Sequence, residues 1–312
     1  MNAINNRTLL WGAAALIATA ALGVLALRHP PEAGMGVSEG RILQVVAGEN
    51  FWGSLASQLG GSHAHVLSIV SDPNADPHEY ASTTDDARAV ANADYAIFNG
   101  AGYDSWGDKL LGASQNPNRK LLDIANLLGK KEGDNPHFFY SPAYVNQVVL
   151  QMESDFIALD PADAPYYRQQ YAVLSAALAG YQNRIIGIKH QFAGTKVAAT
   201  EDVFTYLADA AGLDLVSPPA FMLAVAEGND PPAASVAEFE RLLGSGEVRV
   251  LVYNQQTITP LTVNIEKMAA DRGMGIVGIT EIITPPKLSF QGWMNGEVIE
   301  LQHALSAKAS GH

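Results

Sequence analysis

The chain contains no cysteine among its 312 residues. This absence excludes disulfides, cysteine nucleophiles, thiolate zinc sites and attachment to a membrane through a lipidated N-terminal cysteine. Any metal site in this chain must therefore be built from histidine, carboxylates and water.

Charged side chains are scarce at 16%, whereas apolar residues make up 48% of the sequence. This balance provides a hydrophobic core and argues against disorder, and the length fits one large or two ordinary domains. Positive charge is the scarcer sign, because 19 Lys and Arg oppose 32 Asp and Glu, for a net charge of −13. Nucleic acid and anionic membrane surfaces are therefore disfavoured as partners, and cations are weakly favoured.

The first thirty residues carry an uncharged apolar run from Leu9 to Leu27, with Arg7 just before it. The run is long for the hydrophobic part of a signal peptide and just long enough to span a bilayer. We expect either a cleaved signal peptide or an uncleaved anchor, and both export the rest of the chain. A buried core helix is the less favoured alternative. Residues 30–40, rich in proline and glycine, indicate a linker.

From residue 41 onward, short apolar runs alternate with stretches of helical pattern. The runs are β-branched and not strictly alternating, as buried parallel strands are. The predicted strands are 42–48, 65–70, 94–100, 120–125, 196–200, 213–218, 248–254 and 275–280. The predicted helices between them are 51–59, 84–91, 105–112, 202–211, 234–243 and 262–271. This alternation predicts an α/β fold in two halves.

A long helical region separates the halves. Ser141 and Pro142 predict the start of one helix, as N-cap and first-turn proline. Beyond Asp160-Pro161, apolar positions recur every three or four residues in a proline-free run over 166–192. A helix of that length spans about 40 Å at ~1.5 Å per residue, more than one small domain needs. We interpret it as a rigid strut; the alternative is a surface helix with a break near Gly180.

The predicted organisation is therefore two α/β lobes with parallel sheets, bridged by one long rigid helix. No low-complexity tract interrupts it. Its segments are a signal peptide or anchor with linker, an N-terminal lobe, the bridging helix and a C-terminal lobe: residues 1–40, 41–160, 161–193 and 194–312.

Two histidines follow an Asx-Pro pair, His78 in the stretch ADPHEY and His137 in GDNPHFFY. Proline fixes its own φ and restricts the residue before it, so each histidine leaves a stiff turn. Both lie at predicted strand-to-helix connections, and ligands of open α/β sheets bind at the carboxyl ends of strands. Taken alone, a histidine in such a turn is more often bonded to backbone.

Glu201 and Glu281 each stand in a Thr-Glu pair directly after a predicted strand of the second half. Two imidazoles from one lobe and two carboxylates from the other would meet in the cleft between them. The set suits a divalent first-row cation, with manganese and zinc better matched than iron. For Glu201 the simpler alternative is a first-turn carboxylate that complements a helix dipole.

Other residues carry weaker signals. His63 and His65 flank a strand start and are expected to face solvent, with a second metal pair as the alternative. Tyr103 and Trp106 would either pack in the core, which we favour, or wall the cleft. The sequence contains no H-E-x-x-H or Walker pattern.

With these residues in view, the chain resembles the metal-specific solute-binding proteins of ABC importers, the zinc and manganese or TroA-like group. The resemblance runs from about Arg41 to Ala307. The stretches that carry it are AGENFWGSLASQLGG, DPNADPHEYASTTDDARAVANADYAIFNGAGYDSWGDKLL, GDNPHFFYSPAYV, ALDPADAPYY, VYNQQTITPLT and GITEIITPP. The Asp-Pro-His and Asn-Pro-His blocks, in this order, are its most specific part.

The resemblance implies two α/β lobes bridged by a long helix that limits lobe closure. It implies metal ligands at His78 and His137. Glu201, with Phe204 three residues on, matches the Glu form of the third ligand, which manganese-type members carry. Glu281 takes the place of the usual Asp, so the choice between Zn2+ and Mn2+ stays open.

The sequence departs from many zinc importers because the stretch 104–136 contains no histidine, so their His-rich loop is missing. Without a lipidated cysteine, we expect a periplasmic protein or one tethered to the outer face of the inner membrane. The expected function is a monomeric binding protein, not an enzyme, that delivers Zn2+ or Mn2+ to an ABC permease and its ATPase. The alternatives are a metallohydrolase with an open coordination position and a cell-surface adhesin.

Overall fold

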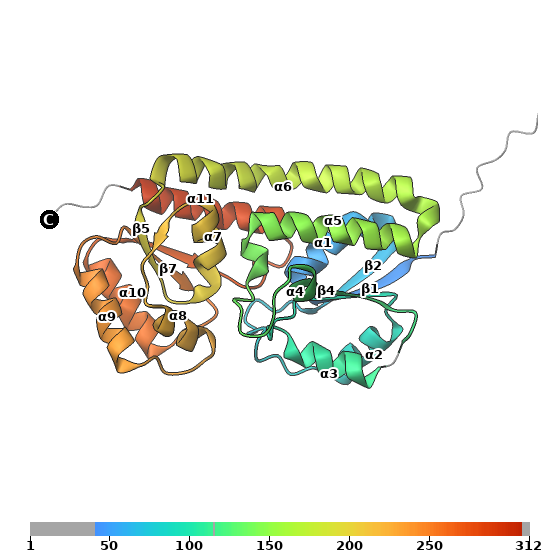
Figure 1. Ribbon diagram of the computed structural model, residues 1–312, viewed down its shortest axis with the longest axis horizontal. Coiled ribbons are helices and arrows are strands. Elements are labelled where there is room, and N and C mark those ends of the chain that lie inside the picture. Colours follow the sequence, from blue (N-terminus) through green and yellow to red (C-terminus); the bar gives the residue numbers. More distant parts are fainter. Residues whose placement is uncertain (1–40, 115, 308–312) are drawn as a thin grey trace, which may run out of the picture. The chain divides into compact units, whose positions relative to one another are not determined.

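Two parallel four-stranded sheets lie within residues 41–114 and 116–307, the parts of the chain that this computed structural model describes (Figure 1). The first sheet has the order β2-β1-β3-β4, with β1 (Leu43–Glu49), β2 (Ala64–Val70), β3 (Tyr95–Phe98) and β4 (Lys120–Asp123). The second has the order β6-β5-β7-β8, with β5 (Lys196–Ala199), β6 (Asp214–Leu215), β7 (Val250–Asn254) and β8 (Gly275–Ile279). Both sheets match the predicted α/β class.

Helices connect the strands and cover the sheets. Because both faces are covered, a central strand such as β3 is buried at every position. The helices are α1 (Asn50–Gly60), α2 (Thr84–Asn92), α3 (Ser105–Ala113), α4 (Ile124–Leu127), α5 (Pro142–Leu159), α6 (Ala164–Phe192), α7 (Thr205–Ala210), α8 (Pro219–Ala226), α9 (Ala233–Gly244), α10 (Pro260–Asp271) and α11 (Phe290–Ser306). Single 3-10 turns are η1 (Gly61–His63), η2 (Phe138–Tyr140), η3 (Pro161–Asp163) and η4 (Asp202–Phe204).

The predicted long helix is α6, whose 29 residues run between the two sheets in the chain (Figure 1). It passes Gly180 without interruption, so the alternative with a break there is wrong. Its buried face consists of Tyr167, Leu174, Leu178, Tyr181, Ile185 and Ile188. The preceding α5 begins as predicted, because the Ser141 side chain accepts a hydrogen bond from the Tyr144 N–H.

A second connection between the halves comes from α11, which packs along α6 (Figure 1). At its start, the Phe290 N–H donates to the Ser54 hydroxyl of α1 at 3.0 Å. At the next residue of α11, the amides of Gln291 and Gln58 exchange hydrogen bonds. Both sheets therefore belong to one compact unit. The segment boundaries at 160 and 194 remain a prediction.

The apolar segment from Leu9 to Leu27, for which a signal peptide or anchor is predicted, lies outside the described residues. Within 41–114 and 116–307, no helix combines the length and the apolar character that crossing a bilayer requires.

A buried polar network ties the halves together beneath the strand ends. The Tyr140 hydroxyl lies 2.7 Å from the Thr280 carbonyl and 2.6 Å from Oε2 of Glu297. Oε1 of Glu297 accepts from the Thr280 N–H at 2.9 Å. Burial raises the pKa of Glu297 to about 7. A protonated Glu297 that donates to Tyr140, which then donates to Thr280, satisfies every one of these contacts.

Replacing Glu297 with Gln should flatten the pH dependence of folding stability. Because its pKa is raised to about 7, Glu297 keeps its proton in the folded state, whereas in the unfolded chain it releases the proton above about pH 4.5. The unfolding free energy that Glu297 contributes is therefore lost as the pH rises from about 4.5 towards 7. The slope it contributes is at most about 1.4 kcal/mol per pH unit. Denaturant unfolding of metal-free protein between pH 5 and 8 measures this slope.

The matched control is Glu300→Gln, an exposed position on the same helix. It should keep the wild-type slope. An E297Q protein with an unchanged slope would show that this carboxyl is ionised in the folded state.

Candidate metal centre

The four candidate ligands all follow carboxyl ends of strands, two from each sheet. His78 lies in the loop after β2, and His137 lies beyond β4 and α4. Glu201 comes two residues after the end of β5, and Glu281 two residues after the end of β8. The parallel strands of each sheet point their ends at the same edge, so the topology brings these residues towards one region.

Each histidine is held by the turn that precedes it. The His78 N–H donates to Oδ1 of Asp76 at 2.9 Å, and the His137 N–H donates to Oδ1 of Asn135 at 3.0 Å. Both are Asx turns that the Asx-Pro-His sequence predisposes. The intervening prolines are anchored as well, because Trp106 donates to the Pro77 carbonyl and Asn99 donates to the Pro136 carbonyl.

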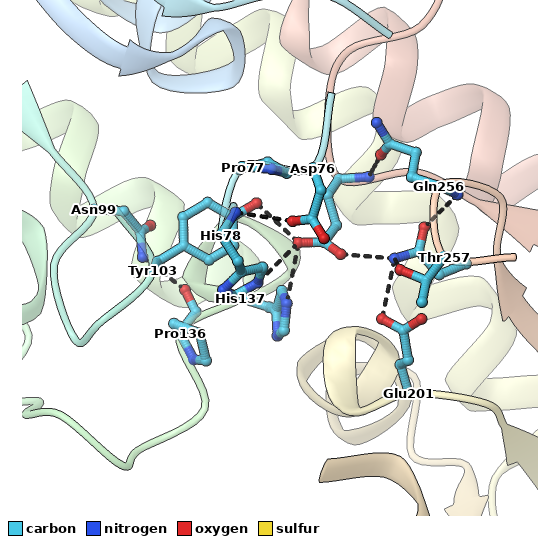
Figure 2. Close-up of polar contacts among 12 residues, drawn as sticks. Asp76, Pro77, His78, Asn99, Tyr103, Pro136, His137, Glu201, Gln256 and Thr257 are labelled. Carbon is cyan, nitrogen blue, oxygen red and sulfur yellow. Dashed lines mark hydrogen bonds and ion pairs between the residues drawn. The ribbon is translucent and has the colours of Figure 1, made fainter. Parts of the chain in front are cut away.

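The two imidazoles converge on one oxygen of Glu281 (Figure 2). Nε2 of His78 lies 3.4 Å from Oε2 of Glu281, and Nε2 of His137 lies 3.3 Å from the same oxygen. The ligand atoms of all three residues lie within 4.8 Å of one another. In a tetrahedral site with bonds of ~2.1 Å, neighbouring ligand atoms are about 3.4 Å apart. The spacing therefore fits a small divalent ion.

The converging nitrogens are buried and unsatisfied. Nε2 of His78 and Nε2 of His137 have no hydrogen-bond partner among the described residues, and His137 is 1% exposed. Buried polar atoms are nearly always hydrogen-bonded, so two adjacent exceptions require an explanation. A cation bonded to both lone pairs would supply the missing partner.

The opposite edge of the His137 ring determines which nitrogen faces the centre. Nδ1 lies 2.8 Å from Oδ1 of Asn135 and 3.4 Å from Oδ1 of Asp202. These two acceptors favour a proton on Nδ1, so Nε2, the nitrogen that faces Glu281, is the one that can bind a metal in the neutral imidazole. Histidines that bind metals are commonly oriented by such a partner on the other nitrogen.

Glu201 lies apart from the other three candidates. It is buried, but it is not in the group whose ligand atoms lie within 4.8 Å. The amide of Asn254 separates the carboxylates, because Nδ2 lies 3.0 Å from Oε2 of Glu201 and 2.7 Å from Oε1 of Glu281 (Figure 2). The separation of Glu201 from Glu281 follows from the strand order, because β7 lies between β5 and β8. At ~4.8 Å per strand, the ends of β5 and β8 are about 9.6 Å apart.

The two carboxylates differ in charge state. Burial and the negative charge of Glu281 raise the pKa of Glu201 to about 8, so this carboxyl is neutral at pH 7. Burial opposes ionisation of Glu281 too, but the imidazoles of His137 and His78 outweigh it and lower its pKa. In return, Glu281 raises the pKa of His78 against the opposing effect of burial. One ionised carboxylate thus faces two imidazoles.

Two residues outside the predicted ligand set hold Glu281 in place. The Tyr103 hydroxyl, fully buried, donates to Oε2 at 2.9 Å, so this side chain contacts the centre as well as packing in the core. Oε1 of Gln256 accepts from the backbone N–H of Glu281, while its Nε2 donates to the Pro73 carbonyl in the loop of His78. Gln256 therefore links the two sides of the centre.

Glu49 is a further buried carboxyl that the patterns missed. It ends β1 and is 0% exposed, and neither carboxyl oxygen has a hydrogen-bond partner among the described residues. Burial, with a further contribution from the nearby charge of Asp104, raises its pKa well above the usual value. Burial therefore favours the neutral form of Glu49. Its only signal in the sequence is its place at the end of β1, the strand that lies between β2 and β3 in the sheet.

His63 and His65 do not form a pair. Nδ1 of His63 lies 2.9 Å from Oδ2 of Asp163, and its ring packs on Tyr166 at 4.1 Å between centroids. His63, Asp160 and Asp163 form a half-exposed group between η1 and the start of α6. The polar contact of His63 with Asp163 and its packing on Tyr166 account for this arrangement, and His65 is not part of it.

Comparisons with known proteins point to one family. Residues 45–304 match the family model described as ZnuA, zinc-uptake complex component A, periplasmic. The manganese-binding lipoprotein MntA of Halalkalibacterium halodurans is 26% identical over 195 residues, which cover 58% of this chain and 62% of the lipoprotein. The match therefore spans less than two thirds of that relative.

Solved structures share the fold. A crystal structure of ZnuA superposes with a TM-score of 0.67 at 20% identity, covering 85% of this chain and all of that one. A manganese-bound periplasmic metal binding protein of Candidatus Liberibacter asiaticus gives 0.69 at 15% identity, covering 84% and 98%. Because the family model spans most of the sequence, from β1 to α11, this chain belongs to the periplasmic zinc-uptake component A family.

Proposed function

We propose that the protein is an extracytoplasmic solute-binding protein that captures Zn2+ or Mn2+ between its two sheets. The ion is cargo and not a resident cofactor. Its ligands are Nε2 of His78, Nε2 of His137 and the carboxylates of Glu281 and Glu201. The observation that carries the proposal is the pair of buried imidazole nitrogens that lack a hydrogen-bond partner and face one carboxylate oxygen. The nitrogen and oxygen set suits both metals.

Glu201 is the ligand that has to change its contacts. In the metal-free arrangement it is neutral and bonded to Asn254. The charge of an incoming ion favours the ionised carboxylate, so Glu201 loses its proton and turns from the amide to the metal. This movement needs no change in the backbone of β5, since a glutamate side chain has three rotatable bonds.

The family supports the remaining parts of the proposal. The captured ion passes to an ABC permease in the membrane, which a cytoplasmic ATPase drives. The protein acts as a monomer and as a carrier, with no catalytic step. It resides in the periplasm or stays tethered to the outer face of the inner membrane through its apolar N-terminal segment. The lipoprotein relative is consistent with a membrane-attached form, although this chain would use a different anchor.

Substitution of His137 tests the centre directly. Zn2+ titration by calorimetry should give one ion per wild-type chain. His137→Ala should weaken binding at least about a hundredfold, which corresponds to ~2.8 kcal/mol. His303→Ala, an exposed histidine on α11, is the matched control and should bind as the wild type does. Equal binding by both variants would rule out this centre.

Proton release tests the role of Glu201. Because its pKa is about 8, wild-type protein at pH 7 should release its proton on binding Zn2+, and affinity should rise with pH up to about 8. Glu201→Gln should release about one proton fewer. Calorimetry in buffers of different ionisation enthalpy counts these protons. Identical counts in the two proteins would mean that Glu201 keeps its proton and is not a ligand.

Removing the Tyr103 hydroxyl should weaken metal binding without removing a ligand. Its donation to Glu281 orients the carboxylate, and loss of such an orienting partner costs about 10–100-fold in affinity. Tyr95→Phe removes a comparable buried bond, from the Tyr95 hydroxyl to Asp155 at 2.8 Å within the first half. Both variants should lose similar unfolding stability, but Tyr103→Phe alone should bind Zn2+ more weakly. An unchanged affinity in Tyr103→Phe contradicts this role.

A further inference from the structure

A cavity of about 380 Å³ opens beside the two imidazoles and connects them with solvent. Its lining combines both halves of the protein, since loops around His78 and His137 face the segment 223–228 at the end of α8. The lining contains no lysine and no arginine. Its charged residues besides the two histidines are all acidic: Asp76, Glu79, Glu132, Asp134, Asp202 and Glu227.

The negative charge of this lining is uncompensated. Among the described residues, none of the six carboxylates forms an ion pair with lysine or arginine. Glu79, Glu132 and Glu227 are exposed and lie at the outer rim. The two halves approach closely there, because a Cβ atom placed on Gly228 would lie 3.7 Å from Oε1 of Glu79. The rim therefore concentrates negative potential in a narrow space.

The inner end of the cavity reaches the two imidazoles of the centre, whereas Glu281 and Glu201 are not among its lining residues. His137 is among the lining residues, although it is 1% exposed and its Nε2 has no hydrogen-bond partner. Next to it, Oδ1 of Asp202 is also buried and lies 3.4 Å from Nδ1 of His137. Oxygen ligands thus extend from the solvent-exposed rim to the buried imidazoles.

We propose that this acid-lined cavity is the path by which the divalent cation reaches and leaves the centre, and that its rim carboxylates accelerate capture. The inference rests on the proposed function, since it presumes that the cargo is a cation. A charged cleft with low-dielectric walls focuses the field and raises association rates by about 10–10³-fold. Carboxylate oxygens along the path also replace water ligands in steps, so the ion is not stripped of its hydration shell at once.

The test is the association rate of Zn2+ with full-length protein, measured by stopped flow against a chromophoric chelator. The variant Glu132→Gln/Glu227→Gln removes one rim charge from each half. At an ionic strength near 0.01 M, where the Debye length is ~30 Å, association should slow by at least about threefold. At 1 M salt, where that length is ~3 Å, the variant and wild type should converge. Equilibrium affinity should change less than the rate, because dissociation by the same path slows as well.

The matched control is Glu238→Gln/Glu300→Gln, which removes the same charge from exposed positions outside the cavity. It should retain the wild-type rate at both salt concentrations. A rim variant that matches this control at low salt would overturn the access path, even if wild-type protein binds one Zn2+ per chain. A wild-type protein that binds no Zn2+ at equilibrium would instead remove the proposed function.

Discussion

The structure depends on one contact between its two halves, the carboxylate of Glu281 against the imidazoles of His78 and His137. Oε2 of Glu281 lies 3.4 Å from Nε2 of His78 and 3.3 Å from Nε2 of His137. The same oxygen accepts a hydrogen bond from the hydroxyl of Tyr103. A buried carboxylate keeps its charge only where donors and positive charge surround it. The partners of Glu281 belong to the half that contains the first sheet, so the two halves have to be in contact at their strand ends. In this arrangement the Nε2 atoms of His78 and His137 have no hydrogen-bond partner among the described residues.

Contacts between helices hold the two halves in this arrangement. The long helix α6 runs beside α11, and α11 contacts α1 of the first half through Phe290 and Gln291. Beneath the centre, Tyr140 bonds to Thr280, the neighbour of Glu281. Because the halves share this many contacts, side-chain movements of Glu201 and Asn254 are the smallest change that would complete the proposed four-ligand site. Capture then costs little conformational entropy, which preserves the binding free energy for the ion.

Sequence patterns predicted the eight strands. Helices cover both faces of each parallel sheet, so the strands are continuous apolar runs that are easy to recognise in the sequence. They also predicted His78, His137 and Glu281 as neighbours, because stiff Asx-Pro turns and strand ends identify positions at the binding edge. They did not separate Glu201 from the others, since the order β6-β5-β7-β8 is a tertiary property that no single strand encodes. Asn254, at the end of β7, carried no signal of its own, because an amide after a strand is common.

The neutral state of the buried carboxyls explains how a centre with several acids stays stable without an ion. Glu201 and Glu49 both have raised pKa values, so Glu281 is the carboxylate that carries charge against the imidazoles. The same property would assist release in the proposed function. As the ion leaves, Glu201, with a pKa of about 8, would take a proton back from neutral solution and return to Asn254. The departing ion therefore does not leave two unpaired carboxylates behind, whose repulsion in a buried site would oppose its release.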